Sequence, residues 1–301
     1  MRTDVEFRAT DGTILRGWHY TPGRSGIFPT VVMAHGFSAV KEMYLDTYAE
    51  AFAQAGLASL VYDNRNFGAS EGKPRQEIDP WLQVRDYSDA ITFATTLSET
   101  DGSKIGVWGS SYSGGVLVVA AIDRRVKCVV SQVPAISGSE GFRRLVRADF
   151  IAPLNAQLAE DRRSRAAGNA PALIPVVDQN PSGVAALPTA DSYEFFTKAA
   201  RDRAPSWRNE VTLRSLEYGL GYEPGAYIAK ISPTPLLLIV ATDDHVAVSD
   251  LAIDAYNNAR EPKKLALLRG GHFDVYGSEF ARSSSLACDW FKEHLVWAEA
   301  A

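Results

Sequence analysis

Cysteine is scarce in this chain, since only Cys128 and Cys288 occur among its 301 residues. Both lie in apolar surroundings, the first in a strand-like segment and the second in a helix-like segment. We therefore expect two buried thiols and no disulfide, a usage typical of a reducing compartment. No secretory leader pattern precedes Val5, so the expected location is the cytoplasm.

Long apolar runs and blocks of basic residues are also missing. No apolar run approaches the roughly 20 residues that a membrane-spanning helix needs. The 31 Lys and Arg residues are outnumbered by 36 Asp and Glu residues, which gives a net charge of -5, and no basic block stands out. We therefore expect neither a membrane nor a nucleic acid as partner. With 46% hydrophobic and 22% charged residues, the composition is that of a globular chain.

Sequence patterns that bind metals or nucleotides are missing as well. The five histidines are scattered, without the paired spacing of metal ligands. No Gly-x-Gly-x-x-Gly pattern follows the first strand, and no P-loop occurs. We therefore expect no metal and no cofactor. The oligomeric state stays open, with a homodimer among the options.

Strand and helix patterns alternate along most of the chain. Near-continuous apolar runs predict strands that are covered on both faces. The predicted strands are residues 5–7, 14–20, 30–34, 58–62, 105–108, 126–131, 235–240 and 264–268, and the predicted helices are 44–54, 80–97, 116–122, 250–260 and 278–296. This alternation predicts an α/β protein, with a mostly parallel sheet and helices on both faces.

The alternation stops at Pro134 and resumes at about residue 233. No buried-strand run occurs between these points. Amphipathic stretches are present instead, at 140–149, 190–201 and 206–218, together with a segment rich in Pro, Ala and Gly at 168–188. The predicted domains are a first part of the core (1–133), a helical cap insertion over the carboxyl edge of the sheet (134–232) and a second part of the core (233–301).

A strand, a turn of small residues and a helix meet at Gly109-Ser110-Ser111-Tyr112-Ser113. This is the pattern of a nucleophile elbow, whose sharp turn exposes a serine hydroxyl and requires small residues two positions before and after it. Gly109 and Ser113 flank Ser111 in this way, although the last position is usually Gly. Ser113 is the alternative nucleophile, but it falls in the first helical turn, where it can cap backbone N–H groups. An ordinary Gly/Ser turn is the non-functional alternative.

A serine nucleophile requires a base, and the base requires an orienting carboxylate. In the elbow-containing fold these residues follow in the order Ser, Asp, His, each after a strand. His272 follows the last predicted strand, so we expect it to be the base. Asp243 and Asp244 follow the strand before it. We favour Asp244 as the acid because it is the fourth residue after that strand and a hydrophobic segment follows it, with Asp243 as the alternative.

When a serine attacks a carbonyl group, negative charge develops on the carbonyl oxygen, and two backbone N–H donors stabilise this oxyanion. We expect these donors at Tyr112, directly after the nucleophile, and at Phe37, in the loop after strand 30–34. We interpret His35 as a structural residue that shapes this loop. Asp63 and Arg65 are expected to brace neighbouring loops by ion pairing rather than to contact substrate.

Four motifs together resemble the α/β-hydrolase superfamily. They are His35-Gly36-Phe37-Ser38, the segment Asp63-Asn64-Arg65-Asn66-Phe67-Gly68-Ala69-Ser70, Gly109-Ser110-Ser111-Tyr112-Ser113-Gly114-Gly115, and Gly271-His272-Phe273. More narrowly, they resemble dienelactone-hydrolase-like and fungal polyketide-transferase-like proteins. The Ser-Tyr pair in the elbow is also similar to cocaine esterase and X-Pro dipeptidyl peptidases. The resemblance covers the two core parts, and it implies the α/β-hydrolase fold with an eight-stranded sheet.

The expected function is that of a cofactor-free serine hydrolase that cleaves an ester, thioester or lactone through an acyl-enzyme. Transfer of the acyl group to an alcohol or amine, as in secondary (polyketide) metabolism, is the first alternative. A non-catalytic binding protein is the second, and a peptidase would need a recognition site that the insertion does not reveal. The aromatic residues of the insertion either line an apolar acyl site or pack within the cap, and we expect packing for most of them. They are Phe142, Phe150, Tyr193, Phe195, Phe196, Trp207 and Tyr218.

Overall fold

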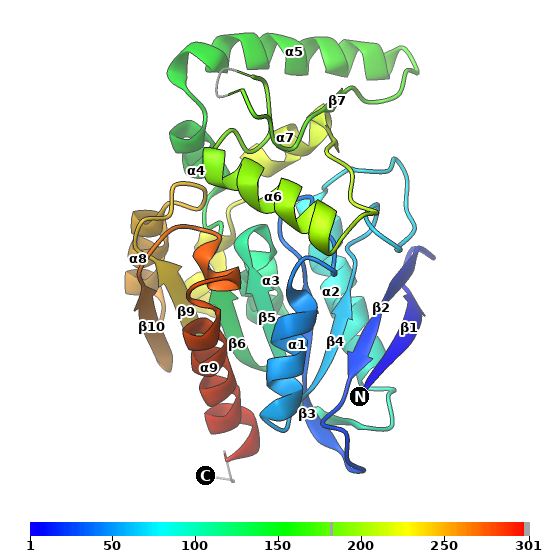
Figure 1. The fold of residues 1–301 in the computed structure, drawn as a ribbon, viewed down its shortest axis with the longest axis vertical. Helices are drawn as coiled ribbons and strands as arrows, with labels where there is room; N and C mark the ends of the chain where they lie inside the picture. The colour runs from blue at the N-terminus through cyan, green and yellow to red at the C-terminus, as the bar shows by residue number, and fades with distance from the viewer. Residues whose placement is uncertain (181–182, 298–301) are drawn as a thin grey trace.

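A computed structural model describes residues 1–180 and 183–297 (Figure 1). Within these residues, eight strands form one sheet in the order β1-β2-β4-β3-β5-β6-β9-β10. β1 and β4 pair with β2 in the antiparallel sense, and the other neighbours are parallel. The predicted mostly parallel sheet of the α/β-hydrolase class is thus confirmed. The strands are β1 (Arg2–Arg8), β2 (Ile14–Tyr20), β3 (Phe28–Ala34), β4 (Ala58–Tyr62), β5 (Thr100–Ser110), β6 (Val126–Gln132), β9 (Leu236–Ala241) and β10 (Lys263–Leu268).

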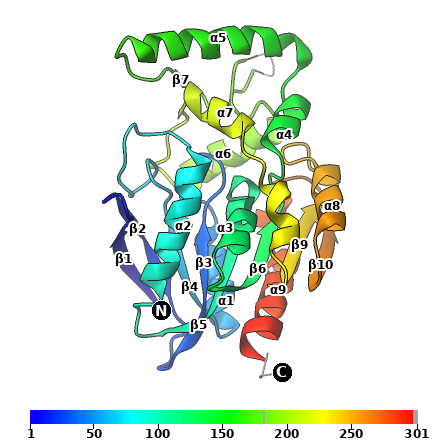
Figure 2. The ribbon, with the colours of Figure 1, turned by 180° about the vertical axis from the view of Figure 1, so that it is seen from behind.

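Helices cover both faces of the sheet. Central strands such as β4 and β9 are therefore buried along their whole length. The helices α1 (Leu45–Gln54) and α9 (Phe280–Phe291) lie on the face toward the viewer in Figure 1. The helices α2 (Pro80–Ala94), α3 (Val116–Ile122) and α8 (Ser249–Asn258) cover the opposite face, seen in Figure 2. The predicted last helix, 278–296, is α9 followed by a π-helical turn, η4 (Lys292–Val296).

Local signals explain where α2 begins. Its N-cap, Asp79, accepts hydrogen bonds from the backbone N–H groups of Trp81 and Leu82, and Pro80 occupies the first helical position. Both features are favourable at a helix N-terminus. Further along α2, Tyr87 is buried, and its hydroxyl reaches the strand ends near the site described below.

Strand register brings several loops to one edge of the sheet. Ala34 at the end of β3 pairs with Gly109 of β5, and Ser110 pairs with Gln132 at the end of β6. Leu268 of β10 pairs with Ala241 of β9. The loops that follow these strands therefore start at the same edge, where α/β proteins bind ligands.

Segments between β6 and β9 lie over this edge (Figure 1). They contain α4 (Gly138–Leu145), α5 (Ala148–Ala166), α6 (Ala190–Asp202) and α7 (Leu213–Leu220), and the 3-10 helix η2 (Pro224–Lys230) follows them. A short antiparallel pair, β7 (Leu173–Ile174) with β8 (Val211–Thr212), was not expected. The division of the chain into core and cap stays a prediction.

The helices of this region do not follow the bounds of the amphipathic stretches. The stretch at 206–218 is helical only from Leu213, since Val211 and Thr212 are paired in β8. The stretch at 140–149 covers parts of two helices, and the second continues to Ala166. This continuation lacks an apolar stripe, because α5 lies at the outer side of the region and buries few of its side chains.

Both cysteines are free thiols, but only Cys128 is fully buried, and Cys288 is partly exposed. This corrects the expectation that both are buried, because the α9 position of Cys288 lies at the margin of the contact with α1. None of the helices in the described residues has the length and apolarity to cross a membrane.

Candidate active site

Ser111 lies at the apex of the turn between β5 and the 3-10 helix η1 (Ser111–Gly115). Its backbone has φ 60°, the left-handed region that is uncommon for residues other than glycine. Space within the turn requires glycine at 109, because a Cβ there would come 2.0 Å from the carbonyl oxygen of Ser113. The strained turn holds the Ser111 side chain out of the backbone surface, as a nucleophile elbow does.

Three residues that are distant in sequence form one hydrogen-bonded chain. His272 Nε2 lies 2.8 Å from Ser111 Oγ, and His272 Nδ1 lies 2.7 Å from Asp244 Oδ2. His272 and Asp244 are buried. The second carboxylate oxygen of Asp244 accepts hydrogen bonds of 2.8 Å from the backbone N–H groups of Val246 and Ala247. The loop after β9 therefore holds the carboxylate in place against the imidazole.

The alternative nucleophile, Ser113, and the alternative acid, Asp243, form hydrogen bonds to other residues than His272. Ser113 Oγ is 2.9 Å from the hydroxyl of Tyr87, beneath the elbow. Asp243 is exposed, and its carboxylate accepts hydrogen bonds from Thr242 Oγ1 and from the backbone N–H of Gly270. The geometry therefore favours Ser111 over Ser113 and Asp244 over Asp243 as the residues that face His272.

The loop after β3 approaches the elbow closely. A Cβ at Gly36 would lie 3.0 Å from Ser111 Cβ, so glycine allows this approach. The next residue, Phe37, has a backbone N–H with no hydrogen-bond acceptor among the described residues. Tyr112 lies at the start of η1, where backbone N–H groups lack intrahelical acceptors. These two N–H groups remain the predicted oxyanion hole.

His35 shapes this loop through hydrogen bonds of a neutral imidazole. Its Nδ1 lies 3.0 Å from the Gly36 carbonyl oxygen, and its Nε2 accepts a bond of 2.9 Å from the backbone N–H of Asn64. An accepting Nε2 is incompatible with the doubly protonated ring. Burial lowers the pKa of His35 below its ordinary value of 6.5.

This lowered pKa predicts a loss of stability in mild acid. Below pH 6.5 the unfolded chain binds more protons at His35 than the folded chain does, so stability falls as pH decreases through 6.5. We expect the free energy of unfolding to depend less on pH in His35→Gln than in the unchanged protein, by up to about 1.4 kcal/mol per pH unit. Denaturant titrations between about pH 5.5 and 7.5 measure this difference. Equal pH dependence in both proteins would contradict the neutral-histidine assignment.

Ion pairs hold the loops behind the site, in line with the bracing interpretation. Asp63 accepts bonds from Lys41 Nζ at 2.7 Å and from the Lys41 backbone N–H at 2.8 Å. Arg65 donates to both carboxylate oxygens of Asp86 and to Asp11. No group of His, Cys, Asp and Glu residues that could hold a metal ion occurs in the described part of the chain.

A buried polar network that the sequence did not reveal joins the elbow to the histidine loop. Tyr276, in the 3-10 helix η3 (Asp274–Tyr276), donates a 2.6 Å hydrogen bond to Ser110 Oγ. Ser110 Oγ also accepts a bond from Gln132, whose amide oxygen accepts one from Tyr48 of α1. The network ties the residue before Ser111 to the helix after His272. Its members come from four separate segments, so no local pattern predicts it.

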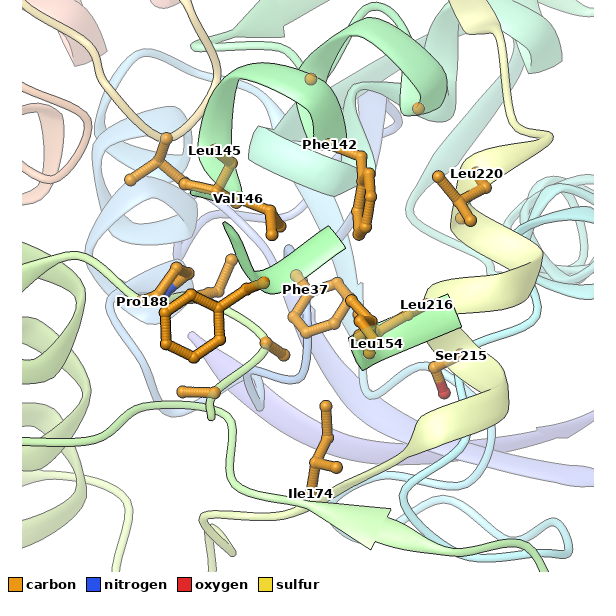
Figure 3. A pocket seen from close by; sticks show the side chains of 18 of the residues that line it. Phe37, Phe142, Leu145, Val146, Leu154, Ile174, Pro188, Ser215, Leu216 and Leu220 are labelled. Carbon is orange, nitrogen blue, oxygen red and sulfur yellow. The ribbon is translucent and has the colours of Figure 1, made fainter. Parts of the chain in front are cut away.

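An apolar cavity of about 210 Å³ has Ser111 among its lining residues. Figure 3 shows side chains around this cavity. Phe142 of α4, Leu154 of α5 and Leu216 of α7 face it from three helices, and Phe37 faces it from the loop after β3. Arg147 is the one charged residue among the described residues that line it. The cavity therefore suits an apolar group attached to a carbonyl at Ser111.

The aromatic residues of the predicted insertion divide between lining and packing. Phe142 and Phe150 line the large cavity. Phe195 and Phe196 line a second cavity of about 30 Å³, which Ser111 and His272 also line. The remaining three, Tyr193, Trp207 and Tyr218, line neither cavity among the described residues. Tyr44, the N-cap residue of α1, packs its ring against Phe195 and Tyr276.

Comparisons with known proteins agree with this geometry. The X-Pro dipeptidyl-peptidase (S15) family model matches residues 11–274. A thiohydrolase from Eupenicillium brefeldianum is 35% identical over 91% of this chain and 88% of its own length. A polyketide transferase from Penicillium crustosum is 33% identical over 91% of each chain. The solved structure of the α/β hydrolase GrgF from a Penicillium species superposes with a TM-score of 0.84 at 27% identity, covering 99% of this chain and 100% of that one.

The fold and these comparisons define an α/β-hydrolase. Within that class, the chain belongs to the X-Pro dipeptidyl-peptidase (S15) family and is a hydrolase-type enzyme with thiohydrolases and polyketide transferases among its relatives. The resemblance to α/β-hydrolases and to fungal polyketide-transferase-like proteins, predicted from four motifs, is confirmed.

Proposed function

We propose that this protein is a serine esterase or thioesterase that cleaves small-molecule acyl esters, thioesters or lactones through a covalent acyl-enzyme. The observation that carries the proposal is the hydrogen-bonded chain from Ser111 through His272 to Asp244 beside an apolar cavity. Nucleophilic acyl transfer requires these three groups: a polarised hydroxyl, a base and a carboxylate that orients the base.

In the proposed mechanism, His272 removes the proton of Ser111 Oγ as this oxygen attacks the carbonyl carbon. The backbone N–H groups of Phe37 and Tyr112 stabilise the oxyanion of the tetrahedral intermediate. The imidazolium then protonates the departing alcohol or thiol, and its charge is stabilised by Asp244. Water, deprotonated by His272, attacks the acyl-enzyme and releases the acid and free Ser111.

Two observations favour an acyl substrate over a peptide. The cavity beside Ser111 is mostly apolar, and the described residues that line it include no carboxylate that could pair with a peptide amino terminus. A relative is also named a thiohydrolase, which supports a thioester as the scissile group. We therefore propose thioesters of apolar acids as the first substrates to test.

Acyl transfer is the second candidate, favoured by the relative named a polyketide transferase. It uses the same Ser111 acyl-enzyme and replaces water by an alcohol or amine acceptor.

We further propose a cytoplasmic location, since both cysteines are free thiols.

A panel of acyl thioesters, esters and lactones, with acyl chains of increasing length, tests the proposal. We expect thiol release together with stoichiometric free acid, and a preference for acyl chains that fill the large cavity. Addition of an acceptor alcohol distinguishes transfer from hydrolysis, since transfer yields an ester in place of the acid. Absence of thiol or alcohol release from every thioester, ester and lactone in the panel would refute the proposal.

A further inference from the structure

We propose that Phe195 of α6 selects water as the acyl acceptor, by closing the space through which a nucleophile reaches the acyl-enzyme. This inference rests on the proposed function and goes beyond it, because it concerns which molecule takes the acyl group. It assigns a specificity-determining role to a residue outside the hydrogen-bonded chain.

The position of the acceptor follows from the chemistry. The attacking oxygen must lie within reach of His272 Nε2, which takes its proton, and of the carbonyl carbon bound to Ser111. Among the described residues, Ser111 and His272 together line the small cavity, whereas the large cavity is lined by Ser111 and not by His272. The large cavity is thus the acyl side, and the small cavity is the acceptor side.

The small cavity is much narrower than the large one. Its volume is about 30 Å³, and one buried water needs about 10–15 Å³. Apart from Ser111 and His272, its walls are mainly apolar, from Met43, Leu45, Leu187 and a set of aromatic rings. An alcohol of several carbons does not fit without displacing one of these walls.

Phe195 is one of the residues that line the small cavity, and neighbouring aromatic rings fix the position of its side chain. Its ring stacks on Phe273, the residue after His272, with centroids 4.4 Å apart and planes 19° apart. It also packs against Tyr276 at 5.3 Å and Tyr44 at 5.6 Å. The hydroxyl of Tyr276 is bonded to Ser110, and the guanidinium of Arg203 lies over the Tyr44 ring.

The same space serves both halves of the reaction. His272 also protonates the leaving group on this side, so Phe195 limits the size of the departing thiol as well as that of the acceptor. In the second half, the acceptor oxygen bonds to the acyl carbon and the bond from that carbon to Ser111 Oγ breaks. The acceptor's proton passes to His272 Nε2 and then to Ser111 Oγ. Water gives the acid, and an alcohol would give an ester without any other reactant.

Partition of the acyl-enzyme between water and added alcohols tests the inference. The protein is supplied with an acyl thioester in the presence of methanol, ethanol or 1-butanol, and the ratio of ester to acid is measured. For Phe195→Ala we expect the butyl ester to acid ratio to rise by about tenfold or more over the unchanged protein, the scale of discrimination that pocket contacts with small apolar groups give. The methyl ester ratio should change much less.

Tyr193→Ala is the matched control, because Tyr193 is an aromatic residue of the same helix that lines neither cavity within the described residues. Its partition ratios should equal those of the unchanged protein. Phe195→Leu should give an intermediate ratio, and it replaces the alanine variant if that variant does not fold. Thioester hydrolysis with unchanged partition in the Phe195 variants would overturn the inference alone. An unchanged protein that forms no acyl-enzyme would overturn both the inference and the proposed function.

Discussion

Replacing Ser111 with Ala should lower kcat for thioester hydrolysis by about 10⁶-fold, the loss found when the nucleophile of a serine triad is removed. The reason is that Ser111 Oγ is the hydroxyl within 2.8 Å of His272 Nε2. Backbone donors remain in the variant, so a small residual rate over the uncatalysed reaction is expected. Steady-state kinetics with the best thioester of the panel measure the effect.

Ser113→Ala is the matched control for this prediction. Its hydroxyl bonds to Tyr87 and not to His272, so the variant should lose about 1 kcal/mol of stability and keep most of its kcat. Circular dichroism and thermal unfolding check that both variants fold. A larger loss of kcat in Ser113→Ala than in Ser111→Ala would show that the nucleophile is the other serine of the elbow.

Replacing Asp244 with Asn should lower kcat by about 10⁴-fold, as amidation of the acid does in other serine triads. The carboxylate accepts a hydrogen bond from His272 Nδ1 at 2.7 Å. It thereby favours the tautomer with the proton on Nδ1, in which the unprotonated Nε2 can accept the proton of Ser111. Its other oxygen is fixed by two backbone N–H groups. An amide oriented by those N–H groups would direct its NH₂ at His272 and favour the wrong tautomer.

Asp243→Asn is the control, because this neighbour is exposed and bonded to Thr242 and Gly270. We expect a kcat close to that of the unchanged protein. The comparison is made under one condition with both variants, from the rate of thiol release. Should the Asp243 variant show the larger loss, the acid of the site would be the exposed residue and the described hydrogen bonds would not be those of the active state.

The sequence predicted the sheet because its strands carry local signals. The runs that became β3, β4 and β9 are apolar along their length, and each ends in a loop of small and polar residues. Parallel pairing then places the ends of such strands at one edge. This is why Ser111, Asp244 and His272 could be expected to meet, although 161 positions separate Ser111 from His272.

The segments over that edge were harder to predict, because their contacts are not local. α5 shows no single apolar stripe, so its continuation to Ala166 was missed. The stacking of Phe195 on Phe273 joins residues 78 positions apart (273 minus 195), and neither residue's neighbours indicate the contact. The bond from Tyr276 to Ser110 is of the same kind. Spatial contacts of this type follow from tertiary packing and not from periodicity.

Covalent labelling with a fluorophosphonate, followed by peptide mass spectrometry, shows whether the Ser111 hydroxyl is an activated nucleophile. We expect one adduct on the peptide that contains Ser111, located at Ser111 by fragmentation, with loss of labelling in Ser111→Ala and after heat denaturation. A folded protein that stays unlabelled at Ser111, or that is labelled equally well after unfolding, would contradict the claim that His272 and Asp244 make this hydroxyl reactive.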